Sequence, residues 1–174
     1  MWADFKASDD YIKKTLKLTG KSEAVLKSHK TYQRYLYNVE KYKFSEWITQ
    51  RPPLPTFGAW RNLGLDKMAL EGKKLEQIKM TSEFKSYERY VLKFDRSIMS
   101  NWKVGFKTEH MIPRDATPME MTAKAEIWAA YRRSDDYVLR ALNLDKLTGS
   151  QLVTAADYKY FKIFTDAKQA MKLK

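Results

Sequence analysis

Two pairs of adjacent carboxylates are the residues in this sequence best suited to acid–base chemistry. They are Asp9-Asp10 and Asp135-Asp136, and each pair directly follows a serine. Neighbouring carboxylates can act as general acid and base when their surroundings drive their pKa values apart. The Ser-Asp-Asp sequence also suits the start of a helix, where serine caps free N–H groups and acids favour the positive end of the dipole. Because the same sequence occurs twice, we interpret both copies as helix caps.

No other group of residues forms a recognisable catalytic or metal-binding motif. The sequence has no cysteine, and its two histidines, His29 and His110, are not spaced as metal ligands. Its six glycines are scattered, so there is no phosphate-binding loop, and no serine lies in a nucleophile elbow. We therefore predict a protein that binds a partner without catalysing a reaction, and we expect neither a metal nor a cofactor.

Basic residues dominate the charge of the chain. The 33 lysines and arginines outnumber the 21 acids and give a formal net charge of +12. This excess attracts polyanions such as nucleic acid, anionic lipid or an acidic protein surface. The candidate partner-binding residues are Arg132 and Arg133, at the end of a predicted helix, and Lys27, Lys30 and Arg34 in the basic N-terminal part.

The composition predicts a fold made of helices. Six glycines and five prolines are too few for a β-sandwich, which needs a turn signal every ~8–12 residues. Hydrophobic residues make up 44% of the chain, enough for a packed core. No apolar run approaches the ~20 residues that a membrane-spanning helix needs. We therefore expect an all-α protein.

Two segments have the hydrophobic period of long amphipathic helices. In each segment the aromatic side chains share one face and the basic side chains share the opposite face. Aromatic rings can stack on nucleic-acid bases, but rings on such a face are expected in the core. The apolar faces comprise Val25, Tyr32, Tyr35, Leu36, Val39 and Tyr42 in the first segment and Phe84, Tyr87, Tyr90, Val91, Phe94 and Ile98 in the second, and the first basic face comprises Lys27, Lys30, Arg34 and Lys41.

An internal repeat organises the chain. An offset of 126 residues places Trp2 on Trp128 and Tyr32 on Tyr158 without a gap. Repeats of this kind indicate that one supersecondary unit is built several times. Each copy predicts a helix, a turn, a short helix, a loop and a long helix. The same offset superposes Ser8-Asp9-Asp10-Tyr11 on Ser134-Asp135-Asp136-Tyr137, Leu16 on Leu142, Leu18 on Leu144 and Leu26 on Leu152.

A looser third copy lies in the middle of the chain. Its Leu63-Gly64-Leu65 sequence matches the Leu-x-Leu sequences of the outer copies, and Tyr87 and Tyr90 match their paired aromatic residues. Two residues compete for the tryptophan position, Trp47 before a Pro-rich turn and Trp60 after it.

These motifs resemble the WY fold of the RXLR effectors that oomycete plant pathogens deliver into host cells. A tryptophan near a helix end, followed by Leu-x-Leu, is similar to the W motif, and the paired aromatics are similar to the Y motif. The segment between Tyr90 and Trp128 resembles the L element of the tandem LWY versions. The resemblance covers roughly residues 2–165. The sequence shows neither an Arg-x-Leu-Arg motif nor a secretion signal, so we expect both to lie upstream of Met1 in the natural protein.

The resemblance implies an all-α array of small helical bundles, with units at residues 1–43, 44–100 and 101–174. It also implies a secreted virulence effector that acts in the cytoplasm or nucleus of the host plant cell, binds a regulatory or signalling protein there and alters immunity. Two alternatives stay open: a basic helical adaptor that binds RNA or anionic lipid, and a helical-repeat scaffold of ordinary cell biology. In the effector family the tryptophan and tyrosine of each unit pack together. The core residues expected here are Trp2, Tyr32, Tyr35, Trp47, Trp60, Tyr87, Tyr90, Trp128, Tyr158 and Phe161.

Overall fold

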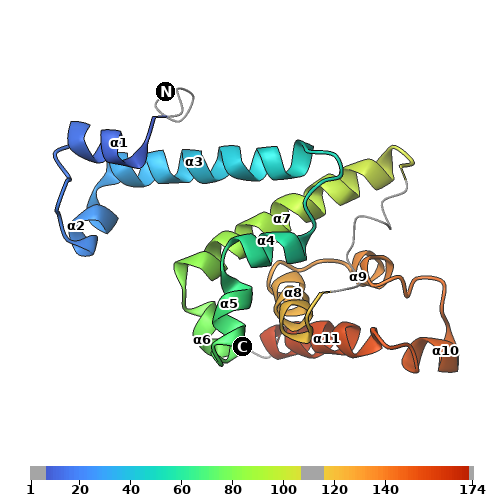
Figure 1. Ribbon diagram of the computed structural model, residues 1–174. Helices are drawn as coiled ribbons and strands as arrows, with labels where there is room; N and C mark the ends of the chain where they lie inside the picture. The colour runs from blue at the N-terminus through green and yellow to red at the C-terminus, as the bar shows by residue number, and fades with distance from the viewer. Residues whose placement is uncertain (1–6, 107–115, 173–174) are drawn as a thin grey trace. The chain divides into compact units, whose positions relative to one another are not determined.

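The computed structural model describes residues 7–106 and 116–172, and these residues form eleven α-helices and no strand (Figure 1). The predicted all-α class is therefore confirmed. Trp2 and His110 lie outside the described residues. Contacts divide the chain into two compact units, Met1–Gln50 and Arg51–Lys174. The division into three WY-like units stays a prediction.

The N-terminal unit contains three helices. These are α1 (Asp9–Thr15), α2 (Glu23–Ser28) and α3 (Lys30–Thr49). His29 caps α3, because its Nδ1 atom accepts a hydrogen bond from the Tyr32 N–H at 3.2 Å. The core of the unit consists of Ile12, Leu18, Tyr32 and Tyr35, with Ala7, Leu16 and Leu26 packed around them.

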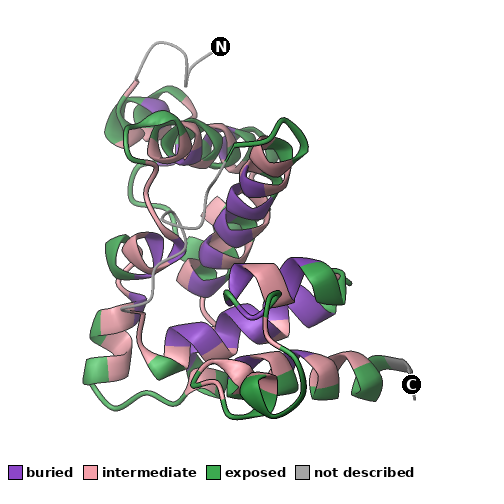
Figure 2. Ribbon diagram, turned by 90° about the vertical axis from the view of Figure 1, so that its right-hand side faces the viewer, coloured by how far each residue is buried: buried purple, intermediate pink, exposed green. Residues whose placement is uncertain are grey.

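The C-terminal unit is centred on two helices, α7 and α8. Helix α8 contacts α7 on one side and α11 more extensively on another, so most of its residues are buried (Figure 2). A helix that is covered on several faces needs small or apolar side chains almost all the way round. The helices of this unit are α4 (Thr56–Asn62), α5 (Leu65–Leu70), α6 (Leu75–Lys79), α7 (Ser82–Lys103), α8 (Pro118–Ala130), α9 (Asp135–Ala141), α10 (Gly149–Val153) and α11 (Tyr158–Lys172).

The two Ser-Asp-Asp sequences begin helices of equal length, as predicted. The Ser8 side chain accepts a hydrogen bond from the Tyr11 N–H at 3.2 Å, and Ser134 accepts one from the Tyr137 N–H at the same distance. The two aspartates that follow each serine occupy the first turn, where they favour the positive end of the helix. The carboxylate pairs therefore have a structural role at both sites.

Each Leu-x-Leu sequence ends a seven-residue helix in the same way. The first leucine is the C-cap of α1, α4 or α9, and the second is buried. The middle residue has a left-handed backbone, with φ of 58° at Lys17, 78° at Gly64 and 57° at Asn143. A left-handed residue at this point lets the following N–H groups bond back to the last turn of the helix. The three copies of the repeat therefore share one local structure here.

In the long helix of each outer copy, the buried residues differ from those that the sequence predicted. Tyr158 and Phe161 are only partly buried in α11, whereas Tyr160 and Phe164 are buried. Helix α8 packs against α11, so the residues of α11 that face α8 are the buried ones. In the N-terminal unit, α1 and α2 are much shorter than the 20-residue α3 and cannot cover its whole length. Three residues of the predicted apolar set are accordingly exposed on α3: Leu36, Val39 and Tyr42. Val25, which was predicted to lie on the same long helix, belongs to the separate helix α2 and is also exposed.

Candidate functional site

A tryptophan and a tyrosine form the centre of the middle copy of the repeat. Trp60 on α4 and Tyr87 on α7 are fully buried, with ring centroids 5.0 Å apart and an interplanar angle of 87°. This edge-to-face geometry suits the charge distribution of aromatic rings and stabilises the pair by about 0.5–1.5 kcal/mol beyond burial. Trp47 instead lies partly buried in the N-terminal unit, where its ring contacts Phe44 at 5.6 Å. Trp60 is therefore the tryptophan that pairs with Tyr87.

The tryptophan of the third copy contacts a different tyrosine from the one its motif predicts. Trp128 on α8 is buried and lies edge-on to Tyr137 on α9, with centroids 6.1 Å apart. The sequence offers little signal for this contact, because Tyr11, the counterpart of Tyr137 in the repeat, is 60% exposed. Tyr158 is instead part of a ring pair with Phe161 along α11.

Tyrosine hydroxyl groups fasten the long helix to the start of the short helix in two copies. The Tyr35 hydroxyl donates to the Ala7 carbonyl at 3.0 Å, and the Tyr90 hydroxyl donates to the Leu54 carbonyl at 2.6 Å. Both carbonyls lie two residues before the first residue of the seven-residue helix. The third copy has Phe161 at this position and so lacks the hydroxyl.

The first tyrosine of the N-terminal pair makes a further polar contact. The Tyr32 hydroxyl donates to Asp9 Oδ1 at 2.7 Å, and Lys13 forms an ion pair with Asp9 at 2.6 Å. Burial raises the pKa of the Asp9 carboxyl, but the hydrogen bonds from Lys13 and Tyr32 outweigh it and lower that pKa overall. This contact joins α1 to α3.

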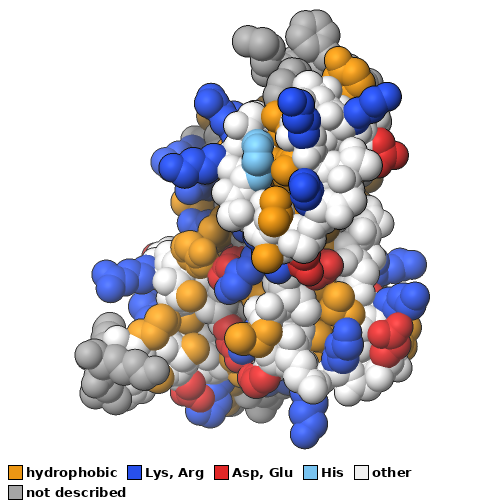
Figure 3. All heavy atoms as spheres, turned by 90° about the vertical axis from the view of Figure 1, so that its left-hand side faces the viewer, with side chains coloured by type: hydrophobic (Ala, Val, Ile, Leu, Met, Phe, Trp, Pro, Cys, Tyr) orange, Lys and Arg blue, Asp and Glu red, His pale blue; other side chains and the backbone are white. Residues whose placement is uncertain are grey.

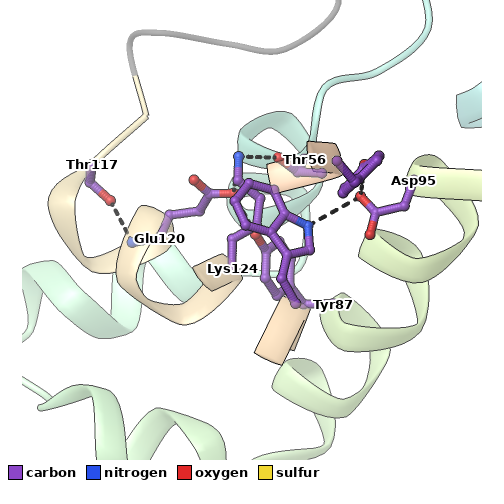
Figure 4. A network of polar contacts seen from close by, with 8 residues as sticks. Thr56, Tyr87, Asp95, Thr117, Glu120 and Lys124 are labelled. Carbon is purple, nitrogen blue, oxygen red and sulfur yellow. Dashed lines mark hydrogen bonds and ion pairs between the residues drawn. The ribbon is translucent and has the colours of Figure 1, made fainter. Parts of the chain in front are cut away.

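A buried acid, Glu120, and a buried lysine, Lys124, lie beside Tyr87 (Figure 4). The Tyr87 hydroxyl donates a short hydrogen bond to Glu120 Oε1, and Lys124 lies 3.6 Å from the same oxygen. Lys124 Nζ also donates to Thr56 Oγ1 at 3.1 Å. Because Glu120 and Lys124 are almost completely shielded from water, each requires the partners supplied by α4 and α7.

A second buried acid, Asp95 on α7, joins α8 and α9. It accepts hydrogen bonds from the Tyr137 hydroxyl at 2.6 Å, Arg133 Nε at 2.9 Å and Trp128 Nε1 at 3.4 Å. Burial raises the pKa of the Asp95 carboxyl, although the three donors oppose this effect. Sequence reasoning did not find Asp95, because the acid stands alone in a helix and its donors come from residues 33 to 42 positions away.

These buried groups hold helices together and do not form an open reaction site. Asp95 and Glu120 are both shielded from water and bonded to tyrosines. Among the residues that the structure describes, no group of three or more His, Asp or Glu side chains could hold a metal ion. No described helix is both long and apolar enough to span a membrane.

The predicted partner-binding residues fall into two groups. Arg133 forms an ion pair with the buried Asp95 at 2.9 Å, so it has a structural contact inside the unit, and its assignment to partner binding stays a prediction. Arg132 is exposed and has a left-handed φ of 53° just after α8. In the N-terminal unit Lys30 and Arg34 are exposed, and Lys27 forms an exposed ion pair with Glu23 at 2.6 Å. Figure 3 shows lysine and arginine side chains projecting from the surface, with hydrophobic side chains between them.

A pocket of about 350 Å³ lies between the end of α7 and the start of α9. One wall of the pocket is Trp102, whose ring centroid lies 5.5 Å from that of Tyr137 and 4.0 Å from the Arg140 guanidinium. No sequence motif indicated this pocket, since its residues come from two separate helices. It is lined by Met99, Trp102, Lys103, Ser134, Asp136, Tyr137 and Arg140.

The described residues define an all-α protein in which one Leu-x-Leu turn recurs three times. Two curated proteins of Phytophthora infestans are similar to this chain over most of its length. A secreted RxLR effector protein is 28% identical over 149 residues, covering 83% of this chain and 61% of that relative. The RxLR effector protein Avr1 is 27% identical over 126 residues, covering 72% of this chain and 54% of that relative. The chain is related to the oomycete RxLR effectors and spans less than two thirds of the length of these two relatives. No family model and no solved structure matches it.

Proposed function

We propose that this chain is the part of a secreted pathogen effector that binds a host plant protein and alters immunity. Both curated relatives are named RxLR effectors, and one is described as secreted. The protein acts in the cytoplasm or nucleus of the host cell, and its partner is a regulatory or signalling protein. Its mechanism is binding, with no reaction catalysed.

The observation that supports this proposal is that several aromatic and acidic residues of the chain are buried inside the protein. Trp60, Tyr87 and Tyr90 are fully buried, and the carboxylates of Asp95 and Glu120 are bonded to neighbouring helices. Side chains used in this way stabilise the fold and cannot contact a partner. Recognition therefore belongs to the exposed side chains, which can vary without disturbing the core.

Three WY-like units with LWY-type linkage are the arrangement that we propose for the fold. The pairing of Trp60 with Tyr87 supports this assignment for the middle copy. The left-handed Leu-x-Leu turn, which occurs in all three copies, supports it for the chain as a whole. The third copy departs from the pattern, since Trp128 contacts Tyr137.

Expression of residues 1–174 inside leaf cells tests the function directly. The measurement is the oxidative burst after treatment with a microbial elicitor. We expect the wild-type chain to change the burst and the Trp60→Ala variant, which disrupts a core, to leave it unchanged. An unaltered burst with the wild-type chain present at normal abundance would contradict the proposal.

A second candidate function is supported by the net charge of +12. A basic helical adaptor would bind RNA or anionic lipid through its exposed lysines and arginines. Such binding weakens steeply as salt increases, because it depends on the release of counterions. Binding to one host protein that persists at physiological salt, together with no binding to RNA or phosphatidylserine vesicles there, favours the effector function over this alternative.

A further inference from the structure

The first and third copies of the repeat can be compared residue by residue. Helices α1 and α9 begin at Asp9 and Asp135, which are 126 residues apart, as the sequence repeat requires. The aromatic pairs Tyr32–Tyr35 and Tyr158–Phe161 have the same offset and the same centroid separation of 6.1 Å. Helices α3 and α11 are therefore equivalent elements of the two copies.

The two copies differ in what covers the long helix. In the third copy, α8 packs against α11 (Figure 1). Tyr160 and Phe164 of α11 are buried. In the first copy, no helix precedes α1 within the described residues 7–50. Among the described residues 7–50, neither α1 nor α2 covers the face of α3 that corresponds to the α8-covered face of α11, since Arg34 and Tyr37 on that face are exposed.

The residues on this face of α3 are polar where those of α11 are apolar. By the 126-residue offset, Arg34 takes the place of Tyr160, and Tyr37 takes the place of Ile163. Arg34 is exposed, and Tyr37 is 60% exposed. Asn38 and Lys41 similarly stand where α11 has Phe164 and Ala167. The face of α3 is therefore basic, with one large aromatic ring, whereas the equivalent face of α11 is apolar and is buried at Tyr160 and Phe164.

We propose that Lys30, Arg34, Tyr37 and Lys41, hereafter the basic face of α3, dock an acidic α-helix of a partner protein. The partner helix lies against α3 as α8 lies against α11. This inference rests on the proposed function, since it supplies the chemistry of the host protein's contact segment. The contact segment of the host protein is a helix whose Asp and Glu residues recur every three or four positions.

The spacing of the residues fits a helical partner. Positions 30, 34, 37 and 41 lie on one side of a helix and extend over about 16 Å at 1.5 Å per residue. A helix of three to four turns matches this length. The α8–α11 pair shows that two helices of this fold pack side by side along the equivalent face.

The charges on this face call for an acidic partner. Within the described part of the chain, Lys30 and Arg34 form no ion pair, so their charges are open to a carboxylate from another molecule. Arginine binds carboxylates with two parallel hydrogen bonds, and arginine and tyrosine are both enriched at the centres of protein interfaces. Tyr37 then supplies apolar contact between the ion pairs.

A peptide titration tests the docking surface on the complete chain. The probe is a synthetic amphipathic helix of about 16 residues with Glu on one side and Leu and Ala on the other, labelled for fluorescence anisotropy at about 0.15 M salt. We expect Lys30→Glu/Arg34→Glu to weaken binding at least about tenfold, and Tyr37→Ala to weaken it severalfold. The matched control is Lys14→Glu/Lys21→Glu, which makes the same change of charge at other exposed positions and should alter binding less than twofold.

Equal weakening by both double variants would overturn the proposal, because it would show attraction to net charge alone. Undiminished binding in Lys30→Glu/Arg34→Glu would overturn it as well. Tighter binding of an RNA hairpin or phosphatidylserine vesicles than of the peptide, with the same sensitivity to these variants, would assign the face to a different class of ligand. A change of the oxidative burst that survives Lys30→Glu/Arg34→Glu would retain the proposed function and remove this site from it.

A photo-crosslinking amino acid at position 37 provides a second measurement in leaf cells. Crosslinks that map to an acidic helical segment of the host protein, and that disappear in Lys30→Glu/Arg34→Glu, support the proposal. Crosslinks confined to a basic or non-helical segment overturn it. Circular dichroism of each variant confirms that the fold is unchanged, as expected for exposed residues.

Discussion

The ring of Tyr87 meets the ring of Trp60 edge-on, with centroids 5.0 Å apart, between helices that are 20 residues apart in the sequence. Neither side chain is accessible to water. The pair therefore joins α4 to α7 by burial as well as by ring geometry. Its contribution to stability can be separated from any role in binding.

Trp60→Ala should lower the free energy of unfolding of the C-terminal unit by about 3–5 kcal/mol, because it leaves a large cavity in the core. Urea unfolding followed by near-ultraviolet circular dichroism measures the change. Leu70→Ala is a suitable control, since Leu70 is exposed and should change stability by less than about 0.5 kcal/mol. A loss of similar size in both variants would show that Trp60 does not anchor the unit.

Removing the hydroxyl of Tyr90 or Tyr35 should lower the free energy of unfolding without leaving a cavity. Tyr90→Phe keeps the ring and removes the donor to the Leu54 carbonyl, so it should cost about 1 kcal/mol. Tyr35→Phe should act similarly in the N-terminal unit, where the Ala7 carbonyl loses its donor. Tyr42→Phe is the control, because Tyr42 is exposed. Chemical denaturation of the three variants checks this, and no difference among them would contradict it.

Asp95 and Asp9 should respond to pH in opposite directions. Burial raises the pKa of Asp95 in the folded state, so its contribution is largest below the unfolded pKa of about 3.9 and falls as pH rises through the folded value. The pKa of Asp9 is lowered by Lys13 and Tyr32, despite burial, so its contribution is present above the unfolded pKa and is lost as pH falls through the folded value.

Unfolding free energies of Asp95→Asn and Asp9→Asn, measured against the wild-type protein from pH 3 to pH 7, test these signs. As pH rises, the advantage of wild type over Asp95→Asn should shrink, and its advantage over Asp9→Asn should grow. The limiting slope for one proton is about 1.4 kcal/mol per pH unit. Parallel trends for the two variants would be inconsistent with the burial of Asp95.

The adjacent arginines after α8 should separate into one structural residue and one surface residue. Arg133→Ala removes a donor from the buried Asp95 carboxylate and should cost about 1–3 kcal/mol. Arg132→Ala should change stability by less than about 0.5 kcal/mol, because its side chain is exposed. Thermal unfolding measures both effects. Equal stability of the two variants would show that the Arg133–Asp95 contact contributes nothing.

Local sequence predicted the all-α fold and the Ser-Asp-Asp caps, because these depend on residues within a few positions of one another. It did not predict the left-handed residue in each Leu-x-Leu sequence or the break between α2 and α3 at His29. It could not choose between Trp47 and Trp60, since that choice depends on which helix meets α7. Asp95 was missed for the same reason, as was the contact of Trp128 with Tyr137. The repeat identified equivalent positions in the two outer copies, but it could not predict that α8 packs against α11. It therefore did not predict that Tyr160 is buried and that its counterpart Arg34 is exposed.

The left-handed residues of the three turns predict substitutions of opposite sign. A positive φ strains any residue with a Cβ atom, so Lys17→Gly should stabilise its unit by about 0.5–1 kcal/mol. Asn143→Gly should raise the free energy of unfolding by less, because asparagine tolerates this conformation better than lysine does. Gly64→Ala should cost about 1 kcal/mol although an added Cβ would meet no atom within 4 Å, so that the backbone conformation alone is responsible. Denaturation midpoints of the three variants decide the matter: a loss at Lys17→Gly, or no change at Gly64→Ala, would mean that the turns are not held in this conformation in solution.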